Sequence, residues 1–439
     1  MRSGELTVRL FFFQIVYRLV ISKLGVIMSR KRSDPDNSTD HCVIVFSHTE
    51  IRKDNRILKV VEALLILDGV HVVAIGRQRR GSSTPVSGPA TKRFSTHDIH
   101  DDEFLESLRR WVRRSSFSES LNPLRSFFRR PLRWLGLVAF NCEIAAESLR
   151  RANWKRTSLV YCNDEYCLPA SVMVAALTGS KLVYDAHELE HDKNGQSRVS
   201  QAITLSLEKI CWPFVDYFIT VSESIRDHYL RTIGPKPSSV VLNSPLLIPS
   251  SEKAEVSDIR KDLGLGPDQI ILIYVGALYE GRGIRGLLDS AESLPKNHHL
   301  VFLGEGALAS DITSRGENLT NVHLVSPVSH EAVVDYISTA DIGLCLLEPV
   351  SLSDILALPN KFFEYAFAGL PVLYSDLPEL ARLGRAYRLG ATYDLSVSAI
   401  LKGVADLKGV RTTRKNLEPL SWERQRKHLA EVISSLLVT

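Results

Sequence analysis

The stretch HCVIVFSHTEIRKDNRILKVVEALLILDGVHVVAIGR (residues 41–77) decides the fold class of this 439-residue chain. Residues 41–48 are nearly all apolar, which is typical of a strand buried on both faces of a sheet. Apolar residues then recur with a helical period, at Ile57, Val60, Val61, Leu64 and Leu65, and Gly69 ends the pattern. Residues 71–77 form a second apolar run. Because parallel strands need a crossover connection, this stretch predicts a βαβ unit.

The same alternation continues along the chain on both sides of a linker. Strands are expected at 158–164, 181–188, 217–223 and 239–245, and then at 269–278, 299–306, 321–326, 340–347 and 370–376. Proline, serine and charged residues at 245–258 indicate a linker. We therefore predict an α/β protein with two Rossmann-like, doubly wound domains, at 41–245 and 246–420, and a final helix at 421–439. Ligands bind beyond the carboxyl ends of such strands, so the active site is expected in the cleft between the domains.

Composition excludes few classes of protein, but the N-terminus and the cysteines bear on where in the cell the protein is expected. The formal charge is only +4, and six scattered cysteines without a C-x-x-C pair favour a reducing cytoplasm over a disulfide framework or zinc site. Residues 1–40 are predicted to be a disordered or interfacial extension. Arg9, Arg18 and Lys23 interrupt its apolar stretch, which is too short between charges to span a bilayer. It is either an interfacial anchor or a translated extension upstream of a natural start at Met28.

The strongest chemical signal is LPNKFFEYAFAGLPVLYSD (358–376). Pro359 suits the first turn of a helix that Gly369 ends. The backbone N–H groups near Asn360 and Lys361 would point out of the helix start, where the helix dipole favours a diphosphate. Glu364, one turn further in, carries a carboxylate that can accept two hydrogen bonds from ribose hydroxyls. Glu364 could equally be an acidic residue that only favours the helix dipole.

Two glycine turns at expected strand ends add to this signal. In YVGALYEGRGIRGLLDS (274–290), Gly276 begins a turn from which Arg282 would project toward phosphate. In FLGEGAL (302–308), Gly304 and Glu305 form a second turn. Glycines after a strand are common, and Arg282 could also be an ordinary solvated arginine.

These motifs resemble those of the family 4 (group 1) retaining glycosyltransferases, which have the two-domain GT-B fold. The similarity covers roughly residues 41–438, with a poorly matched stretch at 80–155, and includes VYDAHELE and the SWE that begins the last helix. The resemblance implies that Glu364 binds the donor ribose, that Arg282 contacts the donor diphosphate, and that His187 lies near the donor sugar. It also implies that Gly276, Gly304, Glu305, Asn360 and Lys361 belong to the donor site, and that the last helix crosses back to the first domain. His187 could instead be a structural histidine.

The sequence departs from the family pattern at two positions. Leu356 stands where the family has the first glutamate of an E-x7-E motif, which contacts sugar hydroxyls, and Ala277 replaces a second basic residue. The implied reaction transfers a sugar from a nucleotide-sugar donor with retention of configuration, with charge on the leaving diphosphate stabilised by Arg282 and the helix start. No cofactor or metal is expected, since Asp98 and Asp101–Asp102 lie in a polar, loop-like stretch. A nucleotide-sugar epimerase and a non-catalytic protein of the same fold remain alternatives.

An arginine-rich segment suggests where the acceptor comes from. Residues 104–140 hold eight arginines and two glutamates, interleaved with aromatic residues. This composition suits an anionic membrane surface or a lipid-linked acceptor, and it also suits a solvated basic helix pair. No nucleic-acid recognition module is evident, so no nucleic-acid partner is expected. The expected partners are thus a nucleotide-sugar donor and a glycan or lipid-linked acceptor, and the expected location is the cytoplasm, peripheral on the cytoplasmic membrane face.

Overall fold

A computed structural model describes residues 41–51, 54–78, 93–100, 137–138, 140–152, 156–247 and 258–438. The N-terminal extension (1–40) and nearly all of the basic segment 104–140 lie outside the described residues, as do Asp101 and Asp102. Among the described residues, no helix is long and apolar enough to cross a membrane.

The first half contains a seven-stranded parallel sheet in the order β3-β2-β1-β4-β5-β6-β7. Its strands are β1 (His41–Phe46), β2 (Val70–Gln78), β3 (Phe94–His100), β4 (Thr157–Asn163), β5 (Lys181–Ala186), β6 (Tyr217–Thr220) and β7 (Ser238–Val240). Its helices are α2 (Asn55–Leu65), α5 (Leu168–Thr178), α6 (Arg198–Cys211) and α7 (Glu223–Thr232). The strand order reverses between β1 and β4, which places a topological switch point at the carboxyl ends of these strands.

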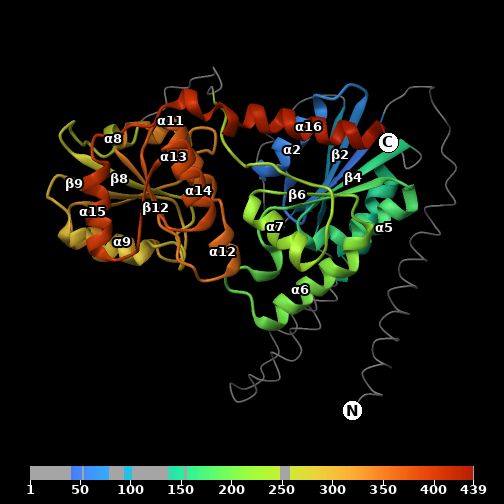
Figure 1. The fold of residues 1–439 in the computed structure, drawn as a ribbon, viewed down its shortest axis with the longest axis horizontal. Coiled ribbons are helices and arrows are strands. Elements are labelled where there is room, and N and C mark those ends of the chain that lie inside the picture. Colours follow the sequence, from blue (N-terminus) through green and yellow to red (C-terminus); the bar gives the residue numbers. More distant parts are fainter. Residues whose placement is uncertain are drawn as a thin grey trace, which may run out of the picture.

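The second half repeats this plan with a six-stranded parallel sheet in the order β10-β9-β8-β11-β12-β13. Its strands are β8 (Ile270–Val275), β9 (His298–Leu303), β10 (Val322–Val325), β11 (Ile342–Cys345), β12 (Val372–Ser375) and β13 (Gly390–Tyr393). The helices from here to the C-terminus are α8 (Ile259–Asp262), α9 (Ile284–Ser290), α10 (Ala309–Asn318), α11 (Val333–Tyr336), α12 (Leu352–Leu356), α13 (Asn360–Phe367), α14 (Pro378–Tyr387), α15 (Val397–Leu407) and α16 (Trp422–Val438). Figure 1 shows the two sheets side by side, each covered by helices, which confirms the predicted fold class.

Two edge strands were not predicted from the sequence. β3 (FSTHDIH) alternates small, polar and apolar residues, and β13 (GATY) is only four residues long. Asp98 lies within β3, where its Cα pairs with that of Gly76, so the prediction of a loop-like stretch at this residue was wrong. Edge strands need only one buried neighbour, and they lack the continuous apolar pattern of central strands.

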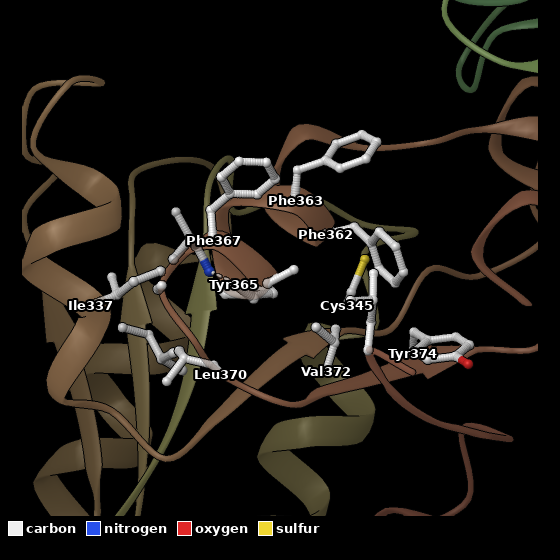
Figure 2. Close-up of a cluster of buried hydrophobic side chains, with 14 of the residues drawn as sticks. Ile337, Cys345, Phe362, Phe363, Tyr365, Phe367, Leu370, Val372 and Tyr374 are labelled. Carbon is white, nitrogen blue, oxygen red and sulfur yellow. Dashed lines mark hydrogen bonds between the residues drawn. The ribbon is translucent and has the colours of Figure 1, made fainter. Parts of the chain in front are cut away.

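Helix α13 is fixed to the second sheet by its aromatic side chains. Figure 2 shows Phe362, Phe363, Tyr365 and Phe367 in the core beside residues of β11 and β12. The Tyr365 hydroxyl donates to the Leu344 carbonyl at 3.2 Å and accepts from the Val275 amide at 2.7 Å. These bonds anchor the helix to the ends of two neighbouring strands. The start of α13 therefore has a fixed position at the carboxyl edge of the sheet.

The two halves are joined by helix α16 and by α12. Helix α16 packs on α2, and the Trp422 indole, buried in the core of the first half, donates to Glu62 at 3.0 Å. On the other side, the Leu189 amide donates to the Ser353 hydroxyl of α12 at 3.2 Å, and the Ser222 hydroxyl donates to the Leu356 carbonyl at 3.1 Å. These contacts hold the two halves against each other.

Glu379 of α14 forms a further link between the halves and allows a test of closure. Its buried carboxylate accepts from the Ser224 amide and hydroxyl, at 2.8 and 2.7 Å, in the first turn of α7. We expect Glu379→Ala to lower the free energy of unfolding by about 1–3 kcal/mol, because it leaves the two half-buried donors of Ser224 without this acceptor. The radius of gyration in small-angle X-ray scattering should increase as the halves separate. Arg382→Ala is the control, because Arg382 also contacts Glu379 but belongs to the same helix. An unchanged radius in Glu379→Ala would contradict this role.

Candidate active site

A cleft of about 1250 Å³ lies between the two halves and is lined by residues of both. All eight residues predicted for the site line it: His187, Gly276, Arg282, Gly304, Glu305, Asn360, Lys361 and Glu364. The structure thus brings together residues separated by up to 177 positions in the sequence (364 minus 187). Their roles in binding remain predictions.

The start of α13 opens into this cleft. Pro359 occupies the N-cap position, just before the helix. The sequence had predicted it one position later, in the first turn. Its side chain has no polar group with which to cap the first amides. The Phe362 amide donates to the Pro359 carbonyl at 3.0 Å, so the amides of Asn360 and Lys361 are the ones placed to bind an anion. Glu364 is 6% exposed, and its burial raises the pKa of its carboxyl group to about 7. The His330 ring lies 3.7 Å from this carboxylate.

Lys361 is half-buried in the wall of the cleft, where the charges of Arg282 and Glu364 both act on it. Its ammonium nitrogen is 3.6 Å from the centre of the Tyr274 ring. Burial lowers the pKa of Lys361 to about 7, and Arg282 lowers it further, although Cys345 and Glu364 act in the opposite direction. Near neutral pH, this group can therefore gain a proton when an anion binds beside it.

Two glycines bring backbone close to this end of the cleft. Gly276 has φ of +116°, a region that side-chain-bearing residues rarely adopt. A Cβ atom at Gly304 would lie 2.0 Å from the Gly276 carbonyl oxygen, so only glycine allows the two turns to touch. Arg282, beyond the first turn, is about one-third exposed, and its guanidinium is 3.9 Å from the Asp354 carboxylate. It therefore keeps donors available for an anionic ligand.

The opposite wall presents a charged histidine held by two buried aspartates. The His187 Nδ1 atom is 3.5 Å from Asp164 and its Nε2 atom is 3.8 Å from Asp185. Burial alone would lower the pKa of His187, but the two carboxylates raise it to about 9. Asp164 also accepts from His48 at 3.0 Å and has a φ of +67°, a strained value of the kind that clusters at functional sites. A pKa raised in this direction favours the protonated form of His187 at neutral pH.

A buried ion pair fixes the strand end that carries this histidine. The Arg56 guanidinium binds both oxygens of Asp185, at 3.2 and 3.0 Å, and donates to the Val241 carbonyl at 2.9 Å. Asp54 caps helix α2, and the Arg56 side chain turns away from it toward Asp185, which is 129 residues away.

Several residues in or near the cleft were not predicted from the sequence. Lys193 reaches three carboxylates: it is within 4.0 Å of Glu165 and Glu188 and pairs closely with Glu190. Burial, together with Glu190, raises the pKa of Glu165. Lys59, from α2, is buried with its pKa lowered to about 7, chiefly by burial, and its charge acts on Glu364 across the cleft. The acidic residues at the end of the predicted strand 158–164 and directly after it, Asp164 and Glu165, were an available signal.

The buried ammonium of Lys361 leads to a prediction about proton linkage. At pH 8, above a pKa of about 7, Lys361 is mostly neutral in the free protein. A bound diphosphate favours the ammonium form, so binding should take up a proton, whereas Glu364 is already ionised at this pH. Calorimetry of UDP binding in two buffers of different ionisation enthalpy measures this uptake. Lys361→Met should abolish it, and equal heats in both buffers for the wild type would contradict the assignment.

Two Rossmann-like halves closed over one charged cleft define the GT-B glycosyltransferase architecture. Residues 269–407 match the family model described as "Glycosyl transferases group 1". The chain is 30% identical, over 165 residues, to a putative teichuronic acid biosynthesis glycosyltransferase, TuaC, of Bacillus subtilis. That alignment covers 38% of this chain and 40% of the relative's length.

Solved structures with the same architecture cover most of the chain. Trehalose-6-phosphate synthase from E. coli, bound with UDP-2-fluoro glucose, superposes with a TM-score of 0.63 at 13% identity, covering 91% of this chain and 99% of its own. HepE from Anabaena, in complex with UDP-glucose, gives a TM-score of 0.59 at 13% identity, covering 90% and 99%. At these identities the similarity shows the fold.

Proposed function

We propose that this protein is a glycosyltransferase that moves a sugar from a nucleotide-sugar donor to an acceptor hydroxyl. The observation that carries the proposal is that one cleft is lined by the Glu364 carboxylate, the start of helix α13 and the Arg282 guanidinium. The group 1 match over residues 269–407 covers all three. A metal is not part of the proposal, and the same holds for a cofactor.

The donor would lie across the second half with its parts in a fixed order. Glu364 would accept hydrogen bonds from the ribose, and the amides of Asn360 and Lys361 would bind the diphosphate. As the bond between the sugar and the diphosphate breaks, its electron pair passes to the phosphate oxygen. Arg282 and the helix start would stabilise that charge, while the acceptor oxygen bonds to the sugar carbon and releases its proton. Family resemblance favours retention of configuration in this step.

A uridine diphosphate sugar is the first donor to test. HepE is described in complex with UDP-glucose, and the E. coli trehalose-6-phosphate synthase with a fluorinated UDP-glucose. The acceptor would enter between His187 and Lys193 on the first half. TuaC is named as a putative teichuronic acid biosynthesis glycosyltransferase, which supports a glycan as the acceptor class. The basic aromatic segment 104–140 favours a lipid-linked acceptor at an anionic membrane surface, and binding to anionic liposomes that weakens with salt would test this.

The test is to incubate the protein with UDP-, GDP-, ADP- and TDP-sugars and to separate the products by anion-exchange chromatography. A transferase should release one nucleoside diphosphate, slowly to water and faster when membrane lipid extract supplies an acceptor. The Arg282→Ala variant should reduce this release by about 100-fold or more, as loss of a charge-stabilising donor does in other enzymes.

Two results would contradict the proposal. Formation of an epimeric nucleotide sugar without release of diphosphate would identify an epimerase. Absence of binding and release with every donor, by protein with a cooperative unfolding transition, would indicate a non-catalytic protein.

A further inference from the structure

The geometry of α12 points to Asp354 as the residue that binds the hydroxyl groups of the transferred sugar. This inference rests on the proposed function. Helix α12 lies where the two halves meet.

The Leu356 side chain is directed away from the cleft. It packs against the hydrophobic core of the first half, and the Leu356 carbonyl accepts the Ser222 hydroxyl. The cleft is lined by Ser353, Asp354, Ala357 and Leu358, which flank Leu356 in sequence, while the Leu356 side chain serves the contact between the halves. A sugar in the cleft would therefore find its nearest carboxylate on α12 at Asp354, two residues earlier.

The Asp354 carboxylate is fixed in position but keeps acceptor capacity. The side chain is nearly buried, and its Oδ2 atom accepts the Ser351 hydroxyl at 2.8 Å, while Ser351 accepts the Asp354 amide at 3.1 Å. This reciprocal cap sets the rotamer. The Oδ1 atom is 3.9 Å from Arg282, which is too far for a hydrogen bond. A carboxylate has about four lone-pair sites, so hydroxyl donors can still be accepted.

The position of Asp354 matches that of the sugar rather than that of the nucleoside. Glu364 and His330 mark the ribose end of the cleft, and Arg282 marks the diphosphate. Asp354 and Glu188 line the same cleft, and Asp354 lies 3.9 Å from Arg282, so a sugar attached to a phosphate beside Arg282 would come within reach of Asp354. The Leu189 bond to Ser353 holds α12, and with it Asp354, against the first half. The contact would thus favour a sugar whose hydroxyls can reach this one carboxylate.

The test compares each nucleoside diphosphate with its sugar derivative, by calorimetry, in the wild type and in Asp354→Asn. The probes are UDP with UDP-glucose, then GDP with GDP-mannose and ADP with ADP-glucose. For the pair that the wild type binds, Asp354→Asn should weaken the nucleotide sugar by about ten- to 100-fold and change the diphosphate by less than about threefold. Asparagine keeps an oxygen for Ser351, so the cap is preserved.

Asp311→Asn is the matched control, because it changes an exposed carboxylate of the second half that pairs with Arg285. It should leave the ratio of the two affinities unchanged. Equal weakening of diphosphate and nucleotide sugar in Asp354→Asn would show that Asp354 acts only through Arg282, and no weakening would show that it does not touch the sugar. If the wild type binds none of the diphosphates, the proposed function itself fails, and that outcome is distinct from both.

Discussion

Replacing Glu364 with alanine is expected to weaken binding of the nucleoside diphosphate and of its sugar derivative alike, by roughly tenfold to several hundredfold. The reason is the loss of two hydrogen bonds to a charged group, at about 1.5–3 kcal/mol each, which water replaces in part. Isothermal calorimetry on the preferred donor measures the change. The carboxylate is 6% exposed and belongs to a helix that is anchored by Tyr365, so the loss should not come from misfolding.

A control separates this effect from a general loss of negative charge. Glu292 is an exposed glutamate on the second half, paired with Arg315, and Glu292→Ala should leave the affinity unchanged. Equal affinity of wild type and Glu364→Ala for the diphosphate would contradict the ribose assignment.

The second large effect is expected on stability, from Arg56. Its guanidinium is 4% exposed and binds the fully buried Asp185 through both oxygens. Arg56→Met should lower the free energy of unfolding by about 3–5 kcal/mol, because it leaves a buried carboxylate without its partner. Urea denaturation of the purified protein measures this change.

Two further variants test the cause of this instability. Adding Asp185→Asn to Arg56→Met should restore part of the stability, since the amide oxygen can still accept the Tyr161 hydroxyl that lies 2.7 Å from Asp185. Lys402→Ala breaks an exposed pair with Asp406 and a contact with the Tyr393 ring, and it should change stability by less than about 1 kcal/mol. A loss in Arg56→Met no larger than that of Lys402→Ala would contradict the importance of the buried pair.

The fold could be predicted because central parallel strands appear in the sequence as continuous runs of apolar residues. Runs such as CVIVF in β1 and ILIYV in β8 are buried on both faces, and one residue after another must be apolar. β3 and β13 both lie at sheet edges, and β13 is also short, so the run of apolar residues is weak in both. The fold class was therefore confirmed, whereas two strands escaped prediction.

The site was predicted on the second half more fully than on the first. Gly276, Arg282, Lys361 and Glu364 lie in continuous motifs that combine a strand end, a turn and a helix start. The contacts of Asp164 with His48 and His187, and those of Lys59 near Glu364, depend on how distant segments meet. Leu356 is instructive, because its apolar side chain is explained by packing against the other half, which no local pattern reveals.

The most direct measurement is a crystal structure of the protein with the nucleoside diphosphate that it binds most tightly. We expect ribose hydroxyls within about 3.2 Å of the Glu364 carboxylate, with the phosphates against Arg282 and the amides of Asn360 and Lys361. A nucleotide bound elsewhere, or bound in this cleft with its ribose away from Glu364, would contradict the account.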